Sequence, residues 1–196
     1  ADMLHNGTLH DVFRDVLVEG CVIWCDWGRS LEFGAETRAR EICNVTFRNC
    51  DLIRNSSVAM DVQNVDYAVI HSVLFEDIRV EYDEVSQPPR IQHDDLDVYV
   101  EDPQSTYMPG LFGSYITYIP EYSKDGKKRG INRDIVFRNI HVTAPRMPKS
   151  FIGGYDENHM SSNIRFENIY LNGKRLTSLE EAQIHLNEFT SDIRFC

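Results

Sequence analysis

Hydrophobic and polar residues alternate in a short segment that recurs along the chain. Its copies begin at Asp15, Asn44, Ser72, Asp134, Asn163 and Asp192, so that most of them lie 28 or 29 residues apart. The longer interval, from Ser72 to Asp134, is about two periods, or one period with an insertion. A repeat of roughly 20–50 residues is typical of proteins built from stacked structural units.

The aligned copies indicate which residues point into the protein. Their second position is always Val or Ile, their fourth is Phe in all copies but the first, and polar residues lie between. This period of two predicts a β-strand with one buried face. The sixth position holds residue types that tolerate a left-handed backbone, namely Gly20, Asn49, Asp77, Asn139 and Asn168. We therefore expect a sharp corner after each strand.

Two further short strands are expected in each repeat. The second strands are predicted near 22–23, 51–53, 79–80, 141–142 and 170–171, and the third near 30–33, 58–62, 114–118, 150–152 and 183–186. Three strands per repeat predict an all-β chain, a right-handed parallel β-helix of about six coils that stack roughly 4.8 Å apart. A leucine-rich repeat has a similar period, but its Leu and Asn spacing is missing.

The 196 residues are expected to form a single domain over 1–196 with one insertion. The insertion, about 84–110, contains Pro88, Pro89 and a cluster of acidic residues, which predicts a loop. Its residues Asp94, Asp95, Asp97, Glu101 and Asp102 lack the glycine-punctuated spacing of a calcium loop. The chain begins without an initiator Met and its first coil shows no cap, so we expect further protein to cover that end.

Charge and cysteine content exclude several classes of partner. The net charge of −11 argues against nucleic acid and anionic membrane surfaces. No apolar run approaches the roughly 20 residues of a membrane span. The five Cys are too few for a disulfide scaffold and show no zinc-site spacing with His, so neither a metal nor a cofactor is expected. Cys21 and Cys50 are expected to stack in the core, as thiols or as a disulfide.

Two segments carry a family resemblance. The stretches 22–36, which reads Val-Ile-Trp-Cys-Asp-Trp-Gly-Arg-Ser-Leu-Glu-Phe-Gly-Ala-Glu, and 162–173 resemble polygalacturonase-type enzymes of glycoside hydrolase family 28, in the pectin-lyase-like β-helix superfamily. The family's catalytic aspartates precede a Gly-His-Gly turn. Here that turn reads Gly28-Arg29-Ser30, and no Asn-Thr-Asp segment precedes it. The family's Arg-Ile-Lys is also missing, since Arg90-Ile91-Gln92 lacks the Lys.

The resemblance without the catalytic residues favours a non-catalytic carbohydrate-binding module, similar to β-helical modules of family 89. It implies a secreted or cell-surface protein that binds a plant cell-wall polysaccharide and is covalently linked to a catalytic domain. Xylan ranks above pectate because a polyanion would meet an acidic protein. Two alternatives stay open, namely the C-terminal portion of a polygalacturonase-like hydrolase and a structural stalk.

Sugar ligands of this superfamily lie along the third strands, which directs attention to their outward side chains. Glu32 and Asp61 lie one repeat apart, so they are expected to be outward neighbours at roughly 5–5.5 Å, with Gln63 beside them. They form a catalytic acid pair, a solvated acidic ladder or a set of acceptors for sugar hydroxyls. Arg29 could bind a hydroxyl or the carboxylate of an acidic sugar, or it could pair with Glu32 or Glu36.

Aromatic residues near the third strands are candidate stacking platforms for sugar rings. Alternation from Val22 predicts that Trp24 points inward, while Trp27 lies at the turn and could contact ligand. Alternation also allows only one of Tyr115 and Tyr118 to point outward, and we choose Tyr115 together with Thr117. The candidate binding residues are therefore Trp27, Arg29, Glu32, Asp61, Gln63, Tyr115 and Thr117.

Overall fold

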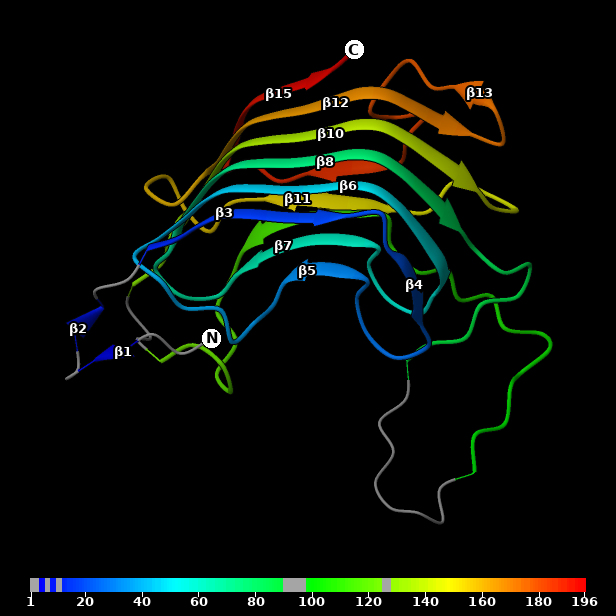
Figure 1. Ribbon diagram of the computed structural model, residues 1–196, viewed down its shortest axis with the longest axis horizontal. Helices are drawn as coiled ribbons and strands as arrows, with labels where there is room; N and C mark the ends of the chain where they lie inside the picture. Colours follow the sequence, from blue (N-terminus) through cyan, green and yellow to red (C-terminus); the bar gives the residue numbers. More distant parts are fainter. Residues whose placement is uncertain (1–3, 6–7, 10–11, 90–97, 125–127) are drawn as a thin grey trace.

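The computed structural model describes residues 4–5, 8–9, 12–89, 98–124 and 128–196, and all regular structure in these ranges is β-strand. It thus confirms an all-β chain. Two parallel sheets lie against each other with the hydrophobic core between them (Figure 1). A separate antiparallel pair is formed by β1 (Leu4–His5) and β2 (Thr8–Leu9). The described part of the chain contains no helix that is long and apolar enough to cross a membrane.

The larger sheet, here called the long-strand sheet, contains the predicted repeats. Its strands are β3 (Val12–Glu19), β4 (Val22–Cys25), β6 (Glu41–Asn55), β8 (Val69–Glu81), β10 (Ile131–Thr143), β12 (Ser161–Leu171), β13 (Lys174–Arg175) and β15 (Thr190–Phe195). Equivalent positions of the repeats pair in parallel register, as in Val45 with Val73 and Val73 with Ile135. Only β13 pairs antiparallel within this sheet, where it folds back on β12.

The predicted corners are confirmed by the backbone. Gly20, Asn49, Asp77, Asn139 and Asn168 all have φ between 51° and 67°. The first position of each copy has the same conformation, with φ between 47° and 59°, which the sequence analysis did not predict. β8, β10 and β12 therefore each bend twice, and β6 has a third residue of this conformation at Arg54. The predicted second strands are mostly the far ends of these bent strands, and only β4 is separate.

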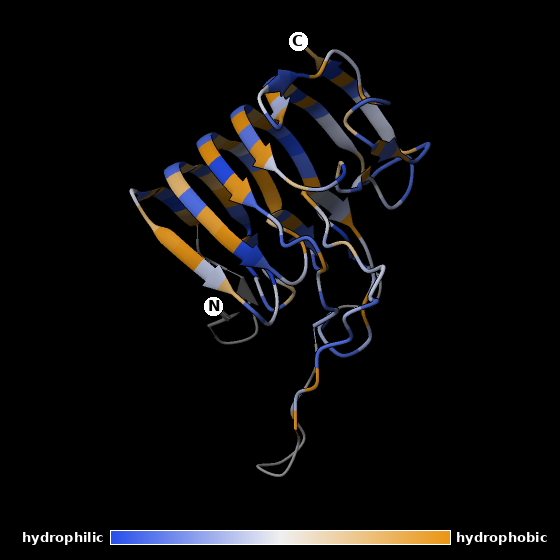
Figure 2. Ribbon diagram, turned by 90° about the vertical axis from the view of Figure 1, so that its right-hand side faces the viewer, coloured by the Kyte–Doolittle hydropathy of each residue, from blue (hydrophilic) through white to orange (hydrophobic). Residues whose placement is uncertain are grey.

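The fourth positions form a column of phenylalanine rings inside the protein. The rings of Phe47, Phe75, Phe137 and Phe166 stack with centroids 4.9, 5.0 and 5.1 Å apart and interplanar angles of at most 10°. This spacing is close to that of neighbouring strands, so that each repeat adds one ring. Hydrophobic and hydrophilic segments alternate along the strands, as the period of two requires (Figure 2).

The outer face of the long-strand sheet carries charges of alternating sign. Arg48 pairs with Glu19 of the preceding repeat at 2.7 Å, and Arg138 reaches both Glu76 at 3.0 Å and Glu167 at 2.6 Å. Exposed ion pairs contribute little stability, roughly 0–1 kcal/mol each. The alternation nevertheless favours the observed order of the strands, because pairing a strand with the next repeat but one would place like charges side by side.

The smaller sheet, here called the short-strand sheet, corresponds to the predicted third strands. It contains β5 (Leu31–Phe33), β7 (Met60–Asn64), β9 (Phe112–Ile116), β11 (Ser150–Gly153) and β14 (Ile184–Leu186). The largest departures are two residues each: β7 lies later than the predicted 58–62, and β9 lies earlier than the predicted 114–118. Residues 84–89 and 98–110 of the insertion form no strand, while Asp94, Asp95 and Asp97 lie outside the described residues.

Candidate functional site

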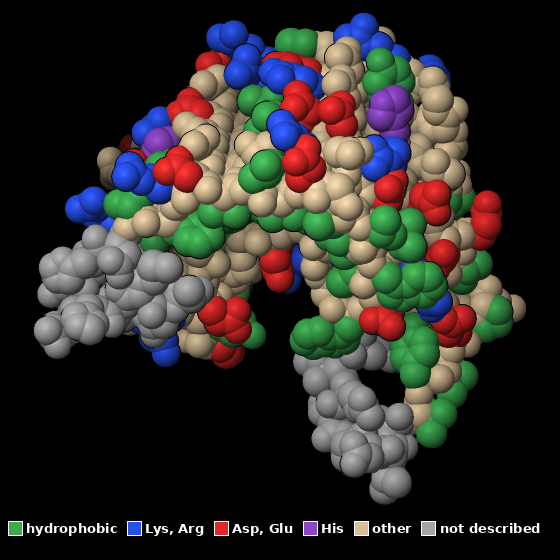
Figure 3. All heavy atoms as spheres, viewed as in Figure 1, with side chains coloured by type: hydrophobic (Ala, Val, Ile, Leu, Met, Phe, Trp, Pro, Cys, Tyr) green, Lys and Arg blue, Asp and Glu red, His purple; other side chains and the backbone are tan. Residues whose placement is uncertain are grey.

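The outer face of the short-strand sheet brings most of the predicted site residues together. Backbone register sets Glu32 beside Asp61, Asp61 beside Gly113, and Gly113 beside Phe151. A second row on the same face pairs Gln63 with Tyr115 and Tyr115 with Gly153. The molecule is hollowed on the side where β5 and β7 lie, and acidic and basic side chains lie at the back of the hollow (Figure 3).

Four of these side chains form one connected polar network. Nε of Arg29 lies 2.5 Å from Oδ2 of Asp61, and its Nη2 donates to the Tyr115 hydroxyl at 3.4 Å. That hydroxyl also accepts from the amide of Gln63 at 2.6 Å and donates to Asp61 Oδ2 at 3.4 Å. Glu32 lies at the edge of the network, 4.0 Å from Arg29 Nε. The predicted neighbourhood of Glu32 and Asp61 is thus present, with Arg29 contacting both.

Asp61 differs from the expectation in its burial. It lies on the predicted face of β7, but none of its side-chain surface is exposed, since Arg29, Tyr115 and Gly113 enclose it. The alternation of β7 correctly identified its face, but it could not show that Arg29 and Tyr115 cover that face. Asp61 therefore holds Arg29 and Tyr115 in place, whereas Arg29 and Glu32 remain partly exposed, at 30% and 38% of their side-chain surface.

Burial shifts the protonation of the acidic groups in this network. Loss of hydration raises the pKa of Asp61 to about 6, although the charge of Arg29 opposes the shift. Burial, opposed by the charge of Arg29, also raises the pKa of Glu32. The pKa of Tyr115 rises to about 12 through burial and the nearby Asp61 carboxylate. Tyr115 therefore remains a neutral hydroxyl that can both donate and accept hydrogen bonds.

An aromatic side chain that the sequence analysis missed lies next to this network. The ring of Phe151 has its centroid 6.3 Å from that of Tyr115, and Phe151 is 46% exposed. The ring lies over Gly153, where a Cβ would come within 2.7 Å of it. The inward position of Ile152 in β11 was sufficient to predict that Phe151 points outward.

The two tryptophans are equally exposed, at 60% each, which corrects the inward prediction for Trp24. The backbone of β4 follows the corner at Gly20 in register with β6, so that Ile23 lies beside the buried Leu52. Val22 and Trp24 therefore point to solvent, and the Arg54 guanidinium lies over the Trp24 ring, 5.4 Å from its centroid. Trp27 lies on the turn before β5, as predicted.

The two residues expected to continue β9, Thr117 and Tyr118, also depart from the prediction. Because β9 ends at Ile116, strand alternation does not apply to Thr117 and Tyr118. Tyr118 is 44% exposed instead of inward, and the Arg129 guanidinium lies 4.9 Å from the centroid of its ring and 5.2 Å from that of Tyr155. Thr117 is half-buried, and its backbone N–H donates to the Asn64 carbonyl, so that it lies at the end of β9 rather than in the polar network.

The cysteines and the described part of the acidic loop, which the sequence analysis also considered, lie outside this face and have structural partners. Cys50 is buried and Cys21 packs against the core beside it, and all five cysteines are free thiols. In the described part of the acidic loop, Glu101 pairs with Arg54 at 2.5 Å.

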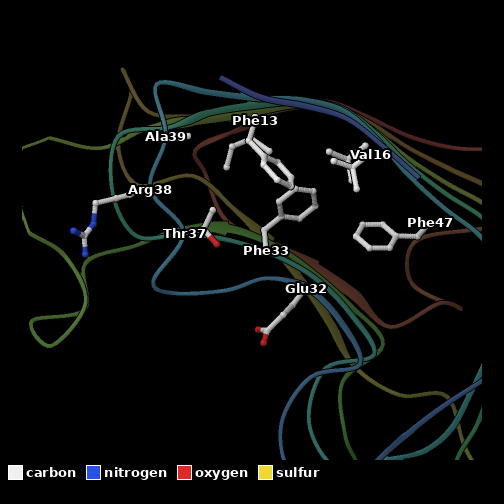
Figure 4. A pocket seen from close by; sticks show the side chains of 10 residues that line it. Phe13, Val16, Glu32, Phe33, Thr37, Arg38, Ala39 and Phe47 are labelled. Atoms are coloured by element: carbon white, nitrogen blue, oxygen red, sulfur yellow. The ribbon is translucent and has the colours of Figure 1, made fainter. Parts of the chain in front are cut away.

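A cavity of about 260 Å³ lies at the end of the core near β3 and β5, where Phe13, Phe33 and Phe47 line it (Figure 4). Most of its lining is apolar, although Glu32 at the edge of the polar network also contributes to it.

Comparison with known proteins identifies no relative: no family model, no curated protein and no solved structure matches this chain.

Proposed function

We propose that the outer face of the short-strand sheet binds a neutral polysaccharide of the plant cell wall, with xylan as the first candidate. The observation that carries this proposal is the combination of a fixed polar network with an exposed aromatic ring. Arg29 and Glu32 offer a donor and an acceptor for sugar hydroxyls, and Phe151 offers an apolar surface on which a pyranose ring can stack.

The geometry suits an extended chain that runs across the strands. Strands of one sheet are separated by roughly 4.8 Å, and a sugar ring in an extended β-linked chain covers about the same length. From the residues next to β5 to Phe151 in β11 there are three strand steps, or roughly 14 Å. A ligand that contacts both ends would therefore span about three to four sugar rings.

Charge favours a neutral ligand over an acidic one. The protein has a net charge of −11, and Glu32 and Asp61 add negative charge to this face. A polyuronate would be repelled over most of the surface, apart from the single cation Arg29 in the network. Hydroxyl groups can accept from Arg29 and donate to Glu32 without this repulsion.

The proposal also concerns how the two sheets are connected. We propose that the two parallel sheets and their connecting turns form a right-handed parallel β-helix of about six coils, related to the pectin-lyase-like superfamily. The 28- and 29-residue register and the stacked phenylalanine column support this architecture. In this account the chain belongs to a secreted protein in which a covalently linked catalytic domain degrades the polysaccharide.

A screen by affinity electrophoresis tests the binding function. The wild type is run through gels that contain xylan, β-glucan, galactan or pectate, beside Arg29→Gln and the control Leu17→Ala. Leu17 is 53% exposed on β3, away from the short-strand sheet, so its loss should leave retardation unchanged. Xylan should retard the wild type more than Arg29→Gln. If no polysaccharide retards the wild type, the proposed function is wrong.

One observation supports a second candidate, a glycoside hydrolase. Glu32 and Asp61 are neighbouring carboxylic acids whose pKa values are both raised, as a general acid requires. The enclosure of Asp61 argues against it, since a buried carboxylate cannot reach a glycosidic bond. Release of reducing sugars from xylan or polygalacturonate by the wild type, lost in Asp61→Asn, would support this candidate instead of the binding module.

A further inference from the structure

Three potential metal ligands come together on the outer face of the long-strand sheet, whereas the polar network lies on the short-strand sheet. They are Glu41, Cys43 and His71, whose carboxylate oxygen, thiol and ring nitrogen all lie within 4.8 Å of one another. Glu41 and Cys43 are two residues apart on β6 and therefore share a face. His71 is the backbone partner of Cys43 on β8.

The position of His71 is fixed by a hydrogen bond to each ring nitrogen. Nε2 lies 2.8 Å from Glu41 Oε1, and Nδ1 lies 3.0 Å from the hydroxyl of Ser72. Metal-binding histidines almost always have such a partner on the second nitrogen, which holds the ring orientation. The tautomer that carries its proton on Nδ1 would donate to the Ser72 hydroxyl and leave the lone pair of Nε2 on the side of Glu41 and Cys43, available to an ion.

The backbone around the trio supports a preformed site. Asn44 and Ser72, which follow Cys43 and His71, both have φ of 53° and mark the first bend of their strands. Only 16% of the His71 side-chain surface and 37% of that of Glu41 are exposed, so the side chains have limited freedom. Ligand atoms of a tetrahedral zinc site lie roughly 3.3–3.8 Å apart, which small side-chain rotations reach from the present separation.

The neighbouring arginines do not exclude a cation. Arg14 on β3 is the backbone partner of Cys43, Arg133 on β10 is that of His71, and Arg40 precedes Glu41. Arg14 lies 3.5 Å from Asp15, and Arg133 pairs with Asp134. Each of these two arginines is thus paired with the carboxylate that follows it. Glu41 and a Cys43 thiolate would supply the negative charge that offsets a divalent ion.

We propose that Glu41, Cys43 and His71 bind one divalent transition-metal ion, preferably Zn²⁺, and leave a fourth position for water. Sulfur and imidazole ligands select Zn²⁺ and Co²⁺ over Mg²⁺ and Ca²⁺. The ion links adjacent repeats by joining β6 to β8. No zinc-site spacing was visible in the sequence because the ligands come from neighbouring repeats, in which Cys43 and His71 are 28 positions apart.

The test begins with metal-free wild-type chain titrated with Co²⁺, whose thiolate charge-transfer absorption reports a bond to sulfur. One equivalent should bind, Zn²⁺ should displace it, and excess Mg²⁺ should not. At a free Zn²⁺ concentration about a hundred times Kd, we expect Tm to rise by about 5–10 °C. His71→Gln and Cys43→Ser should each weaken binding by at least about tenfold, and Ser72→Ala by about tenfold.

Two matched variants serve as controls on the same fold. His141→Gln replaces a histidine of the long-strand sheet that stacks on Tyr170, and Cys196→Ser removes an exposed thiol; neither change should alter the titration. A measurement on wild type needs no variant to fold: Zn²⁺ should slow alkylation of Cys43, mapped by mass spectrometry, and leave Cys196 unchanged. Absence of binding, binding that survives His71→Gln, or protection of Cys196 instead of Cys43 would each overturn the proposal.

Discussion

The Asp61 carboxylate occupies the space directly above Gly113. A Cβ built on Gly113 would lie only 2.1 Å from Asp61 Oδ1 and 2.9 Å from its Cγ. Gly113 is the backbone partner of Asp61 on the next strand, so that the missing side chain makes room for the carboxylate. Asp61 in turn holds Arg29 and Tyr115. The arrangement of the polar network therefore depends on a glycine that offers no chemistry of its own.

Gly113→Ala is expected to destabilise the protein by about 1–3 kcal/mol, because the added methyl group must displace a buried carboxylate. Sugar binding should weaken with it, since Arg29 and Tyr115 lose their anchor. The control is Gly34→Ala on the neighbouring segment, where the nearest atom would be Glu32 Cδ at an ordinary 3.5 Å. Urea unfolding measures the stability of the two variants. Equal stabilities of the two variants would show that Asp61 is not held by this contact.

The raised pKa of Asp61 predicts a pH dependence of stability. The folded-state pKa of about 6 exceeds the ordinary 3.8, so the native state retains a proton that the unfolded state releases between these values. The group's contribution to stability is complete below pH of about 4 and is lost as the pH rises through 6. The loss should reach at most about 3 kcal/mol, measured as the difference between wild type and Asp61→Asn across this window.

The same shift can be observed directly by carbon NMR of the Asp61 carboxyl group. In Arg29→Gln the pKa should rise above that of the wild type, because the positive charge that stabilises the carboxylate has gone. An Asp61 pKa at or below 3.8 in the folded wild type would contradict the described burial of the network.

The phenylalanine column should dominate the stability of the core. Phe75→Ala and Phe137→Ala each remove a fully buried ring stacked between two others, which should cost about 3–5 kcal/mol. Phe151→Ala, which removes a half-exposed ring, should cost much less. Denaturant unfolding compares the three. A loss below about 1 kcal/mol at both Phe75 and Phe137 would mean that the column is not buried.

The two tryptophans provide a matched pair for locating the ligand. Both are 60% exposed, but Trp27 precedes β5 at the short-strand sheet, while Trp24 lies on β4 with Arg54 over its ring. Trp27→Ala should weaken xylan binding by at least about 1 kcal/mol, and Trp24→Ala should have no effect. Affinity electrophoresis of both variants beside wild type measures this. Equal retardation of wild type and Trp27→Ala would remove Trp27 from the site.

Much of the fold could be predicted from the sequence because each repeat contributes equivalent residues to the same columns. The inward Phe column and the corners at Asn49 and Asn139 follow from periodicity and from the residues that tolerate positive φ. The bend at Asn44 and its equivalents was missed, although Asn and Asp recur there, because the alternating pattern around it continues without interruption. The position of Trp24 was missed because a corner changes which residues of the next strand point inward.

The site was less predictable because its geometry depends on side chains from several repeats. The neighbourhood of Glu32 and Asp61 follows from their spacing of one repeat. The burial of Asp61 depends on Arg29, from a turn, and on Tyr115, from a strand that follows the insertion. The outward direction of Phe151 could have been predicted from the inward Ile152, but its place beside Tyr115 appears only when β11 is paired with β9.

The central claim is that a polysaccharide crosses the short-strand sheet from Arg29 to Phe151, and calorimetric titration with xylan oligosaccharides tests it most directly. The account predicts that affinity rises with chain length up to about four sugars, the span of three strand steps, and then levels off. Phe151→Ala should lower the affinity for the longer oligosaccharides by at least about fivefold and leave that for the shortest almost unchanged. Equal affinities of wild type and Phe151→Ala at every length would contradict the account.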